Sequence, residues 1–341
     1  MCRWFAYISN TEACLLEDVL IDPAHSISKQ VHDHYLPGLS HHEPAEDPRA
    51  TEREIAMRNK LFNADGLGIA WYSTSRAEYG ECEGPRPIIY KILRQPLTDP
   101  GFRSICANTS TLAVFAHIRA ASGETAITEY NNHPFQFGRW VFMHNGVVAH
   151  FHLIKREVCA VISHEAIQLV KGTTDSEHVA ALVFTYLEEM KGPQAWERSH
   201  SLTDVKICLE KAITTIIDIQ HRVVPKHGIT PEASSLNIAI TDGIQLVTIR
   251  FRNHTTQHPP SLYFSTRAGI SLNRKFPGHP DKDGDNGLQN LREVGEHGDH
   301  VIVCSEPTTF RPSDWELIEK NECIMVEPDM VIQRGQVNVR Y

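Results

Sequence analysis

The sequence predicts an α+β fold in which two stacked β-sheets carry helices on their outer faces. Strand-like runs rich in aromatic and β-branched residues fill the chain up to Asn145, two amphipathic helices follow, and strand-like runs return after Pro225–Pro231. This order of strands, helices and strands argues against a repeating βαβ array. No linker divides the 341 residues, so we expect a single domain spanning residues 2–341.

The strands expected in the first half are short and largely apolar. They are Arg3–Ile8, the Gly-rich Asn63–Tyr72, Pro87–Leu93, Leu112–Ile118 and Arg139–Asn145. Leu112–Ile118 is almost wholly apolar, which is typical of a buried strand. The last of these strands is expected to end in an Asn-Gly turn. A short helix over Glu12–Ile21 is expected before Asp22-Pro23.

Two helices are expected in the middle of the chain. Apolar residues from Val179 to Met190 follow the spacing of an amphipathic helix, and Thr174-x-x-Glu177 predicts a capping box at its start. A longer helix is expected from Leu202 to about Arg222. The later strands are expected at Leu236–Thr241, Ile244–Phe251, Ser261–Ser265, His300–Cys304 and Cys323–Val326. The polar segments at 40–55 and 273–299 are predicted to be loop insertions.

Bulk composition excludes several classes of function. The content of 41% hydrophobic and 22% charged residues is that of an ordinary globular protein. A net charge of −9 argues against nucleic acid or an anionic membrane as partner. The N-terminal residues do not read as a signal peptide, no apolar run is long enough to span a membrane, and the eight cysteines form no CxxC pair. We therefore expect a reduced, cytoplasmic protein.

Neither a metal nor another cofactor is expected. The sequence contains no HExxH motif and no Cys/His set with zinc spacing. Asp281-x-Asp283-x-Asp285 begins like a calcium loop, but Asn286 replaces the required glycine and Arg292 stands where the bidentate glutamate belongs.

Cys2 is the first candidate for chemistry, because removal of Met1 would make it the N-terminal residue. The thiolate is the reactive form of cysteine, and an α-amino group with a pKa near roughly 7.7–8.0 can accept the thiol proton. One residue would then supply both nucleophile and base. The alternative is that a small residue follows Met1 only to permit its removal.

Three further segments offer binding groups. Arg119 ends an apolar strand, where its guanidinium is either a holder for a carboxylate or a side chain that reaches out to solvent. Asn145-Gly146 either forms a hairpin turn or supplies an amide and a backbone N–H to an oxyanion. Asp175 either helps to start a helix or accepts a substrate ammonium group. Together with the Cys2 thiol, these groups fit an α-amino acid with a reactive side-chain carbonyl, such as glutamine or a γ-glutamyl compound.

Several short motifs occur in the order seen in class II glutamine amidotransferases, which are N-terminal-nucleophile hydrolases, and the chain resembles that family. The motifs are MCRWFAY, Pro23-Ala-His-Ser26, NADGLGIAWY, FAHIRAAS, Asn132-His-Pro-Phe135, FMHNG, TTDSE and Ser305-Glu-Pro307. The resemblance spans nearly the whole chain. It looks strongest to the compact branch with the fungal Dug-type subunit of glutathione degradation and the γ-glutamyl hydrolase of the ergothioneine pathway.

The resemblance implies a four-layer αββα sandwich and a role for each site residue. Cys2 would be the nucleophile, and Asn145 and Gly146 would form the oxyanion hole. Arg119 would bind the substrate α-carboxylate with Ser122 nearby, and Asp175 would bind the α-amine. The chain has no room for the synthase domain of larger relatives. We therefore expect that ammonia passes to a separate partner or is not the product that matters.

The function expected from this resemblance is hydrolysis of a γ-glutamyl amide through a thioester on Cys2. Glutathione or a related γ-glutamyl thiol compound is the first choice of substrate. Two alternatives remain open: a glutaminase subunit that supplies ammonia, and a non-catalytic subunit that binds γ-glutamyl compounds. The Dug-type resemblance also implies a separate peptidase-like partner subunit.

Overall fold

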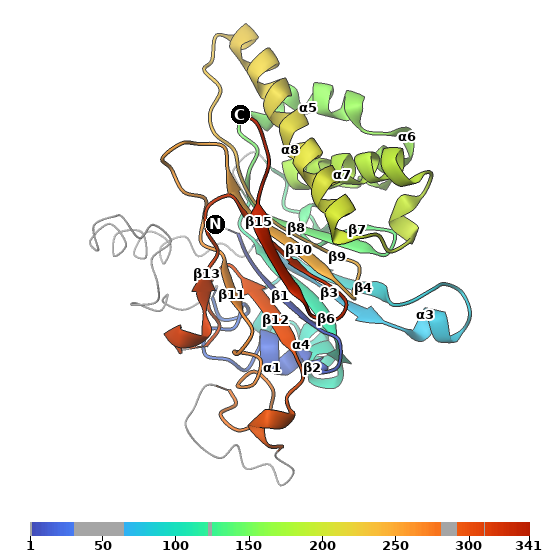
Figure 1. Ribbon diagram of the computed structural model, residues 1–341, viewed down its shortest axis with the longest axis vertical. Helices are drawn as coiled ribbons and strands as arrows, with labels where there is room; N and C mark the ends of the chain where they lie inside the picture. Colours follow the sequence, from blue (N-terminus) through green and yellow to red (C-terminus); the bar gives the residue numbers. More distant parts are fainter. Residues whose placement is uncertain (1, 31–64, 122–124, 281–291, 310) are drawn as a thin grey trace.

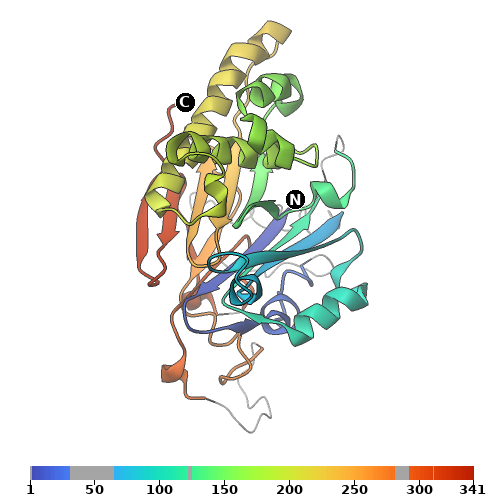
Figure 2. The same ribbon diagram turned by 90° about the vertical axis from the view of Figure 1, so that its right-hand side faces the viewer.

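Two large antiparallel sheets lie face to face and carry helices on both outer sides (Figures 1 and 2). The computed structural model describes residues 2–30, 65–121, 125–280, 292–309 and 311–341. Within these residues the layers follow the order helix, sheet, sheet, helix, which confirms the four-layer αββα sandwich.

The first sheet has β1 at its centre, between β12 and β6. Every strand pair in it is antiparallel. In spatial order its seven strands are β13 (Glu316–Leu317), β11 (Tyr263–Ser265), β12 (His300–Cys304), β1 (Arg3–Ser9), β6 (Ala113–Arg119), β3 (Gly66–Ser73) and β4 (Arg86–Ile92). The start of the chain is thereby held in the middle of a sheet.

The second sheet has six strands and is antiparallel as well. They are, in spatial order, β15 (Ile332–Gln336), β14 (Glu322–Val326), β10 (Leu246–Arg252), β9 (Ser235–Thr241), β8 (Trp140–Val147) and β7 (Phe135–Phe137). The neighbouring strands β8 and β9 are separated in sequence by the main group of helices.

That group covers the outer face of the second sheet and consists of α5 (Phe151–Val161), α6 (His164–Leu169), α7 (Asp175–Lys191) and α8 (Leu202–Val223) (Figure 1). The opposite outer layer contains α1 (Leu16–Leu20) and α4 (Pro100–Asn108). Smaller elements are α3 (Ser75–Glu78) and the pair β2 (Cys14–Leu15) and β5 (Ser110–Thr111). Single 3-10 turns are η1 (Pro96–Thr98), η2 (Glu129–Asn131), η3 (Ala195–Glu197), η4 (Val224–His227), η5 (Val294–Glu296) and η6 (Pro312–Asp314).

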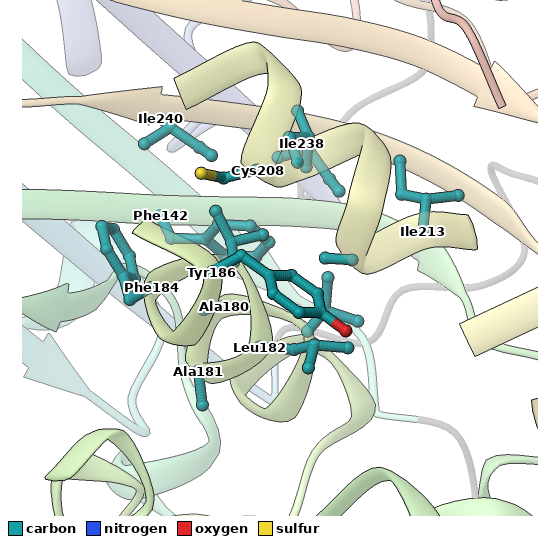
Figure 3. Packing of buried hydrophobic residues seen from close by; sticks show 14 of the residues in the cluster. Phe142, Ala180, Ala181, Leu182, Phe184, Tyr186, Cys208, Ile213, Ile238 and Ile240 are labelled. Carbon is teal, nitrogen blue, oxygen red and sulfur yellow. The ribbon is translucent and has the colours of Figure 1, made fainter. Parts of the chain in front are cut away.

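Among the described residues, three apolar cores separate the four layers. In β1, Phe5 and Tyr7 face the α1 and α4 side, whereas Trp4 and Ala6 face the second sheet, as the two-residue period of a strand requires. The third core lies between the second sheet and α5–α8, where Phe142 and Ile240 meet residues of α7 and α8 (Figure 3). Because β1 is buried on both faces, its first residues are fixed in position.

Most of the expected elements are present, with differences that have a local cause. The helix expected over Glu12–Ile21 is only α1, because Cys14 and Leu15 pair with β5 instead. Asn145-Gly146 does not form the expected turn, since β8 continues through both residues and pairs with β9. The capping box at α7 is half formed: Thr174 Oγ1 accepts from Glu177 N–H, but the Glu177 carboxylate binds Lys171 N–H and Gly172 N–H.

Of the two predicted loop insertions, the first lies wholly outside the described residues and the second lies partly outside them. Residues 40–55 and 281–291 lie outside the described residues. The described start of the second segment is anchored, because Arg274 Nε lies 2.5 Å from Asp18 Oδ1. Across the described part of the chain, no helix combines the length and apolar character that a membrane crossing needs.

Candidate active site

Cys2 lies directly before β1 and beside the end of β6. Its Sγ is 3.5 Å from the carbonyl oxygen of Ala120 and accepts a hydrogen bond from Ala120 N–H at 3.4 Å. Burial raises the pKa of the Cys2 thiol; the Ala120 hydrogen bond and the positive charge of Arg119 oppose that rise. A neutral thiol in this position needs a neighbouring base to become a nucleophile.

Arg119, at the end of β6, is buried rather than extended into solvent, with 3% of its surface exposed. Its Nη1 donates to Ala126 O at 3.0 Å and its Nη2 donates to Thr125 Oγ1 at 2.6 Å. Both acceptors are uncharged, and within the described ranges no carboxylate forms an ion pair with this guanidinium. Burial lowers the pKa of Arg119, while Cys2, Asp65 and Asp175 counteract the shift. The cation therefore stands close to several acidic groups and is neutralised by none of them.

Asp65 is a member of this site that sequence reasoning missed. Its Oδ2 accepts from Ala121 N–H at 2.7 Å, and its own N–H donates to Arg119 O at 2.9 Å. Asp65 thus fixes the backbone on both sides of Ala120, the residue that contacts the Cys2 sulfur. The Gly-rich pattern of Asn63–Tyr72 predicts a strand, and nothing in that pattern singles out Asp65.

Asn131 connects the Arg119 side of the site to the start of α7. Its Nδ2 donates to Ala126 O at 2.9 Å, the carbonyl oxygen that Arg119 also binds. Its Oδ1 accepts from Thr173 N–H at 2.7 Å. One buried amide therefore joins the loop under Arg119 to the segment that precedes Asp175.

Asn145 lies near the start of β1, to which Ser305 connects it. Its Nδ2 donates to Ser305 Oγ over a long 3.4 Å, and Ser305 Oγ accepts from Trp4 N–H at 3.1 Å. Asn145 is buried, and this single weak bond leaves its amide with donor capacity to spare.

Gly146 occupies a position where no side chain fits. A Cβ at this residue would lie 1.9 Å from the carbonyl oxygen of Ser235 on β9 and 2.7 Å from His144 Nε2. Close pairing of β8 and β9 at Gly146 therefore requires glycine.

Asp175 is the first residue of α7 and is half-buried. Its Oδ1 accepts from Ser176 N–H and its Oδ2 accepts from Val148 N–H, both at 2.8 Å. The carboxylate thereby ties α7 to the end of β8. Ser176 Oγ also lies 3.2 Å from Oδ1, so Oδ2 is the oxygen that keeps a lone pair for a further donor.

His144 supports the same junction from inside β8. Its Nδ1 lies 2.8 Å from Ser176 Oγ and its Nε2 lies 3.2 Å from Ser235 O. Burial lowers the pKa of His144, so the ring is neutral and donates from Nε2 to the carbonyl. Ser176 then donates its hydroxyl proton to Nδ1.

The structure brings Cys2, Arg119 and Asp175 within electrostatic reach of one another and places Asn145 against the Cys2 strand. Ser122 lies outside the described residues.

The atoms of Asp18, Asp22 and His279 cluster within 4.8 Å, which is a spacing that could hold a metal ion. Arg274 already bonds to both carboxylates there, at 2.5 Å and 3.1 Å, so we interpret this group as an ion-pair cluster.

Comparison with known proteins finds one matching family and one curated relative. Residues 51–218, which include Arg119, Asn145, Gly146 and Asp175, match the family described as "Glutamine amidotransferases class-II". The chain is also 28% identical to "Probable glutamine amidotransferase DUG3" of Saccharomyces cerevisiae over 346 residues, which covers 100% of this chain and 86% of that protein. This chain carries a class II glutamine amidotransferase domain. Members of the family are hydrolytic or amidotransferase enzymes.

Two solved structures have a fold similar to that of this chain. A glutamine aminotransferase class-II domain protein from Silicibacter pomeroyi aligns with a TM-score of 0.58 at 19% identity, covering 98% of this chain and 99% of that one. The allosteric regulatory enzyme of purine biosynthesis aligns with a TM-score of 0.52 at 13% identity, covering 99% of this chain and 50% of that one. At these identities the likeness shows the fold alone, and that fold is the sandwich of two sheets between helices described above.

Proposed function

We propose that this protein is a cysteine-dependent γ-glutamyl amide hydrolase whose nucleophile is Cys2, with Met1 removed. The observation that carries the proposal is the position of Cys2 at the start of the central strand β1, with Arg119 and Asp175 beside it. A reactive thiol, a cation for a carboxylate and an anion for an ammonium group match the three functional groups of a γ-glutamyl amide.

The reaction proceeds in two steps. The α-amine of Cys2 accepts the thiol proton, and the sulfur attacks the γ-carbonyl carbon. The C–N bond then breaks, the amine returns the proton to the leaving nitrogen, and a γ-glutamyl thioester remains. Water, deprotonated by the same amine, attacks the thioester, which releases glutamate and restores the thiol. The raised pKa of the Cys2 thiol makes this base necessary.

Arg119 and Asp175 orient the amino-acid end of the substrate. Of the five guanidinium N–H groups of Arg119, two are engaged by Thr125 and Ala126 within the described residues, so others can hold the α-carboxylate. The free lone pair of Asp175 Oδ2 accepts the α-ammonium. Holding both groups lines up the γ-carbonyl with the Cys2 sulfur, and such orientation lowers the barrier substantially.

Asn145 and Gly146 supply the oxyanion hole. The Asn145 amide has one weak acceptor, Ser305 Oγ at 3.4 Å, which it can exchange for a developing oxyanion. Gly146 contributes its backbone N–H to the same oxyanion.

Glutathione or a related γ-glutamyl thiol compound is the preferred substrate. This choice rests on the resemblance to the fungal subunit of glutathione degradation and on 28% identity to the yeast DUG3 protein. Free glutamine is the second choice, with ammonia passed to a separate partner. A peptidase-like partner subunit remains part of the proposal.

The test incubates purified wild-type and Cys2→Ala protein with glutathione and, separately, with glutamine. Released glutamate is followed by mass spectrometry. We expect Cys2-dependent release, faster from glutathione. Release of glutamate by Cys2→Ala at the wild-type rate would refute the mechanism. Release from glutamine but not from glutathione would make glutamine the substrate. No release from either would favour the non-catalytic alternative, unless added partner restores activity.

A further inference from the structure

The hydroxyl of Ser176, the second residue of α7, lies between two acceptors. His144 Nδ1 is 2.8 Å from Ser176 Oγ on one side, and Asp175 Oδ1 is 3.2 Å from it on the other. A hydroxyl carries one hydrogen, so Ser176 can donate to only one of them at a time. The acceptor that receives this hydrogen decides how strongly the Asp175 carboxylate can bind a ligand cation.

The geometry around His144 directs the hydrogen to its ring. Ser235 O is a carbonyl oxygen, which can only accept, and it lies 3.2 Å from His144 Nε2, so Nε2 carries the ring hydrogen. In a neutral imidazole, Nδ1 is then the acceptor. Burial lowers the pKa of His144 and keeps the ring neutral. The contact from Ser176 Oγ to His144 Nδ1 is also the shorter of the two, and both side chains are buried.

The Ser176 hydroxyl therefore turns its oxygen, rather than its hydrogen, toward the Asp175 carboxylate. The groups that donate to this carboxylate are the backbone N–H of Ser176 at Oδ1 and that of Val148 at Oδ2, each at 2.8 Å. Backbone N–H groups carry no net charge, so they fix the carboxylate in place without neutralising it. Asp175 thus keeps its negative charge for a ligand.

We propose that His144 is a positioning residue for recognition of the substrate α-ammonium group, because it accepts the Ser176 hydroxyl hydrogen and so keeps that hydrogen away from Asp175. The inference rests on the proposed function, in which Asp175 binds the α-ammonium. Without an acceptor at position 144, Ser176 would donate to Asp175 Oδ1, which is its other acceptor. That hydrogen bond would stabilise the carboxylate before any ligand arrives, and the carboxylate would bind an ammonium group more weakly.

The test compares the binding of L-glutamate with that of glutarate, which is the same dicarboxylate without the α-amine. Titration calorimetry on the full chain gives the selectivity, defined as the Kd of glutarate divided by the Kd of L-glutamate, and it needs no turnover at Cys2. We expect the wild type to prefer L-glutamate at least about tenfold, as a charge-assisted hydrogen bond allows.

Two substitutions of similar shape at His144 separate the acceptor from the packing. His144→Leu removes every acceptor and should lower the selectivity about threefold or more. His144→Asn offers an amide oxygen to the Ser176 hydroxyl and should keep the selectivity within about twofold of the wild type. Both variants lose the bond from His144 Nε2 to Ser235 O, so that loss cancels in the comparison.

The hydroxyl of Ser176 gives a reading that a merely structural role of His144 would not move. Ser176→Ala removes the hydrogen that would pass to Asp175, so it should leave the selectivity within about twofold of the wild type. In that background, His144→Leu should have no further effect on selectivity. An unchanged selectivity in His144→Leu, or an equal loss in the His144→Leu, Ser176→Ala double variant, would overturn the proposal.

Asp175→Asn separates a failure of this inference from a failure of the proposed function. It removes the anion and should abolish the preference for L-glutamate. A preference that persists in Asp175→Asn, or a wild type that binds neither compound, would contradict the proposed function and the inference together. If Asp175→Asn loses the preference while His144→Leu keeps it, the proposed function stands and the role of His144 is refuted.

Discussion

Asn145 and Asn237 face each other across β8 and β9, so the amide that we propose to be catalytic can be compared with a structural one. Asn145 donates one hydrogen bond of 3.4 Å to Ser305 Oγ. Asn237, which is fully buried, donates to Pro260 O at 2.9 Å and to Ser261 O at 3.3 Å. The same substitution at the two positions should therefore have opposite consequences.

Asn145→Ala removes a weak bond, worth about 0.5–1.5 kcal/mol of unfolding free energy at most. It also removes the proposed oxyanion donor, and loss of such a donor typically lowers kcat about 10²–10³-fold. Asn237→Ala leaves two buried carbonyl groups with fewer donors, at a cost of about 1–3 kcal/mol. At roughly 2 °C per kcal/mol for a chain of this size, its Tm should fall about 2–6 °C.

The assay measures kcat for glutamate release and Tm by differential scanning calorimetry for both variants. We predict a large loss of kcat with a small change of Tm for Asn145→Ala, and less than about a tenfold loss of kcat for Asn237→Ala. Equal losses of kcat in the two variants, or wild-type kcat in Asn145→Ala, would refute the oxyanion role.

The remaining predictions concern three other positions. Gly146→Ala should lower Tm by several degrees, because its Cβ would lie 1.9 Å from Ser235 O; an unchanged Tm in calorimetry would contradict the close pairing. Arg119→Lys should raise KM for the γ-glutamyl substrate about tenfold or more while kcat changes less, because an ammonium lacks the forked donors of arginine. An unchanged KM in steady-state kinetics would contradict this prediction. Burial lowers the pKa of Lys91 to about 8, with Glu177 and Glu129 opposing the shift and Lys171 adding to it. Acetylation of Lys91 by acetic anhydride, followed by peptide mass spectrometry, should therefore level off above about pH 8, where ordinary lysines still gain reactivity; a rise that continues beyond pH 10 would contradict it.

The elements whose sequence signal lies within a few neighbouring residues could be predicted from the sequence. The aromatic and β-branched run from Trp4 to Ile8 and the apolar spacing after Val179 predicted β1 and α7, because both signals lie within a few neighbouring residues. The sequence signal for α4 is also local, since Asp99 caps its first turn and Pro100 follows, although we did not expect that helix.

The features that the sequence did not predict depend on contacts between segments that are far apart in the chain. Asn145-Gly146 has the composition of a turn, but pairing with β9, about ninety residues later, extends the strand through it. Asp65 and Asn131 belong to the site through bonds to Ala121 and Thr173, which no short window contains. The Arg119 guanidinium was expected either to pair or to reach solvent, whereas it is buried on neutral acceptors of its own loop.

The most direct test of the account is covalent trapping at Cys2. A glutamine analogue with a diazoketone in place of the side-chain amide alkylates a thiolate that attacks its carbonyl group, and peptide mass spectrometry locates the adduct. The account predicts one adduct, on an N-terminal peptide that begins with Cys2 and lacks Met1, with loss of glutamate release in proportion to labelling. A fully active protein that retains Met1, or an adduct on one of the other cysteines with Cys2 unmodified, would contradict it.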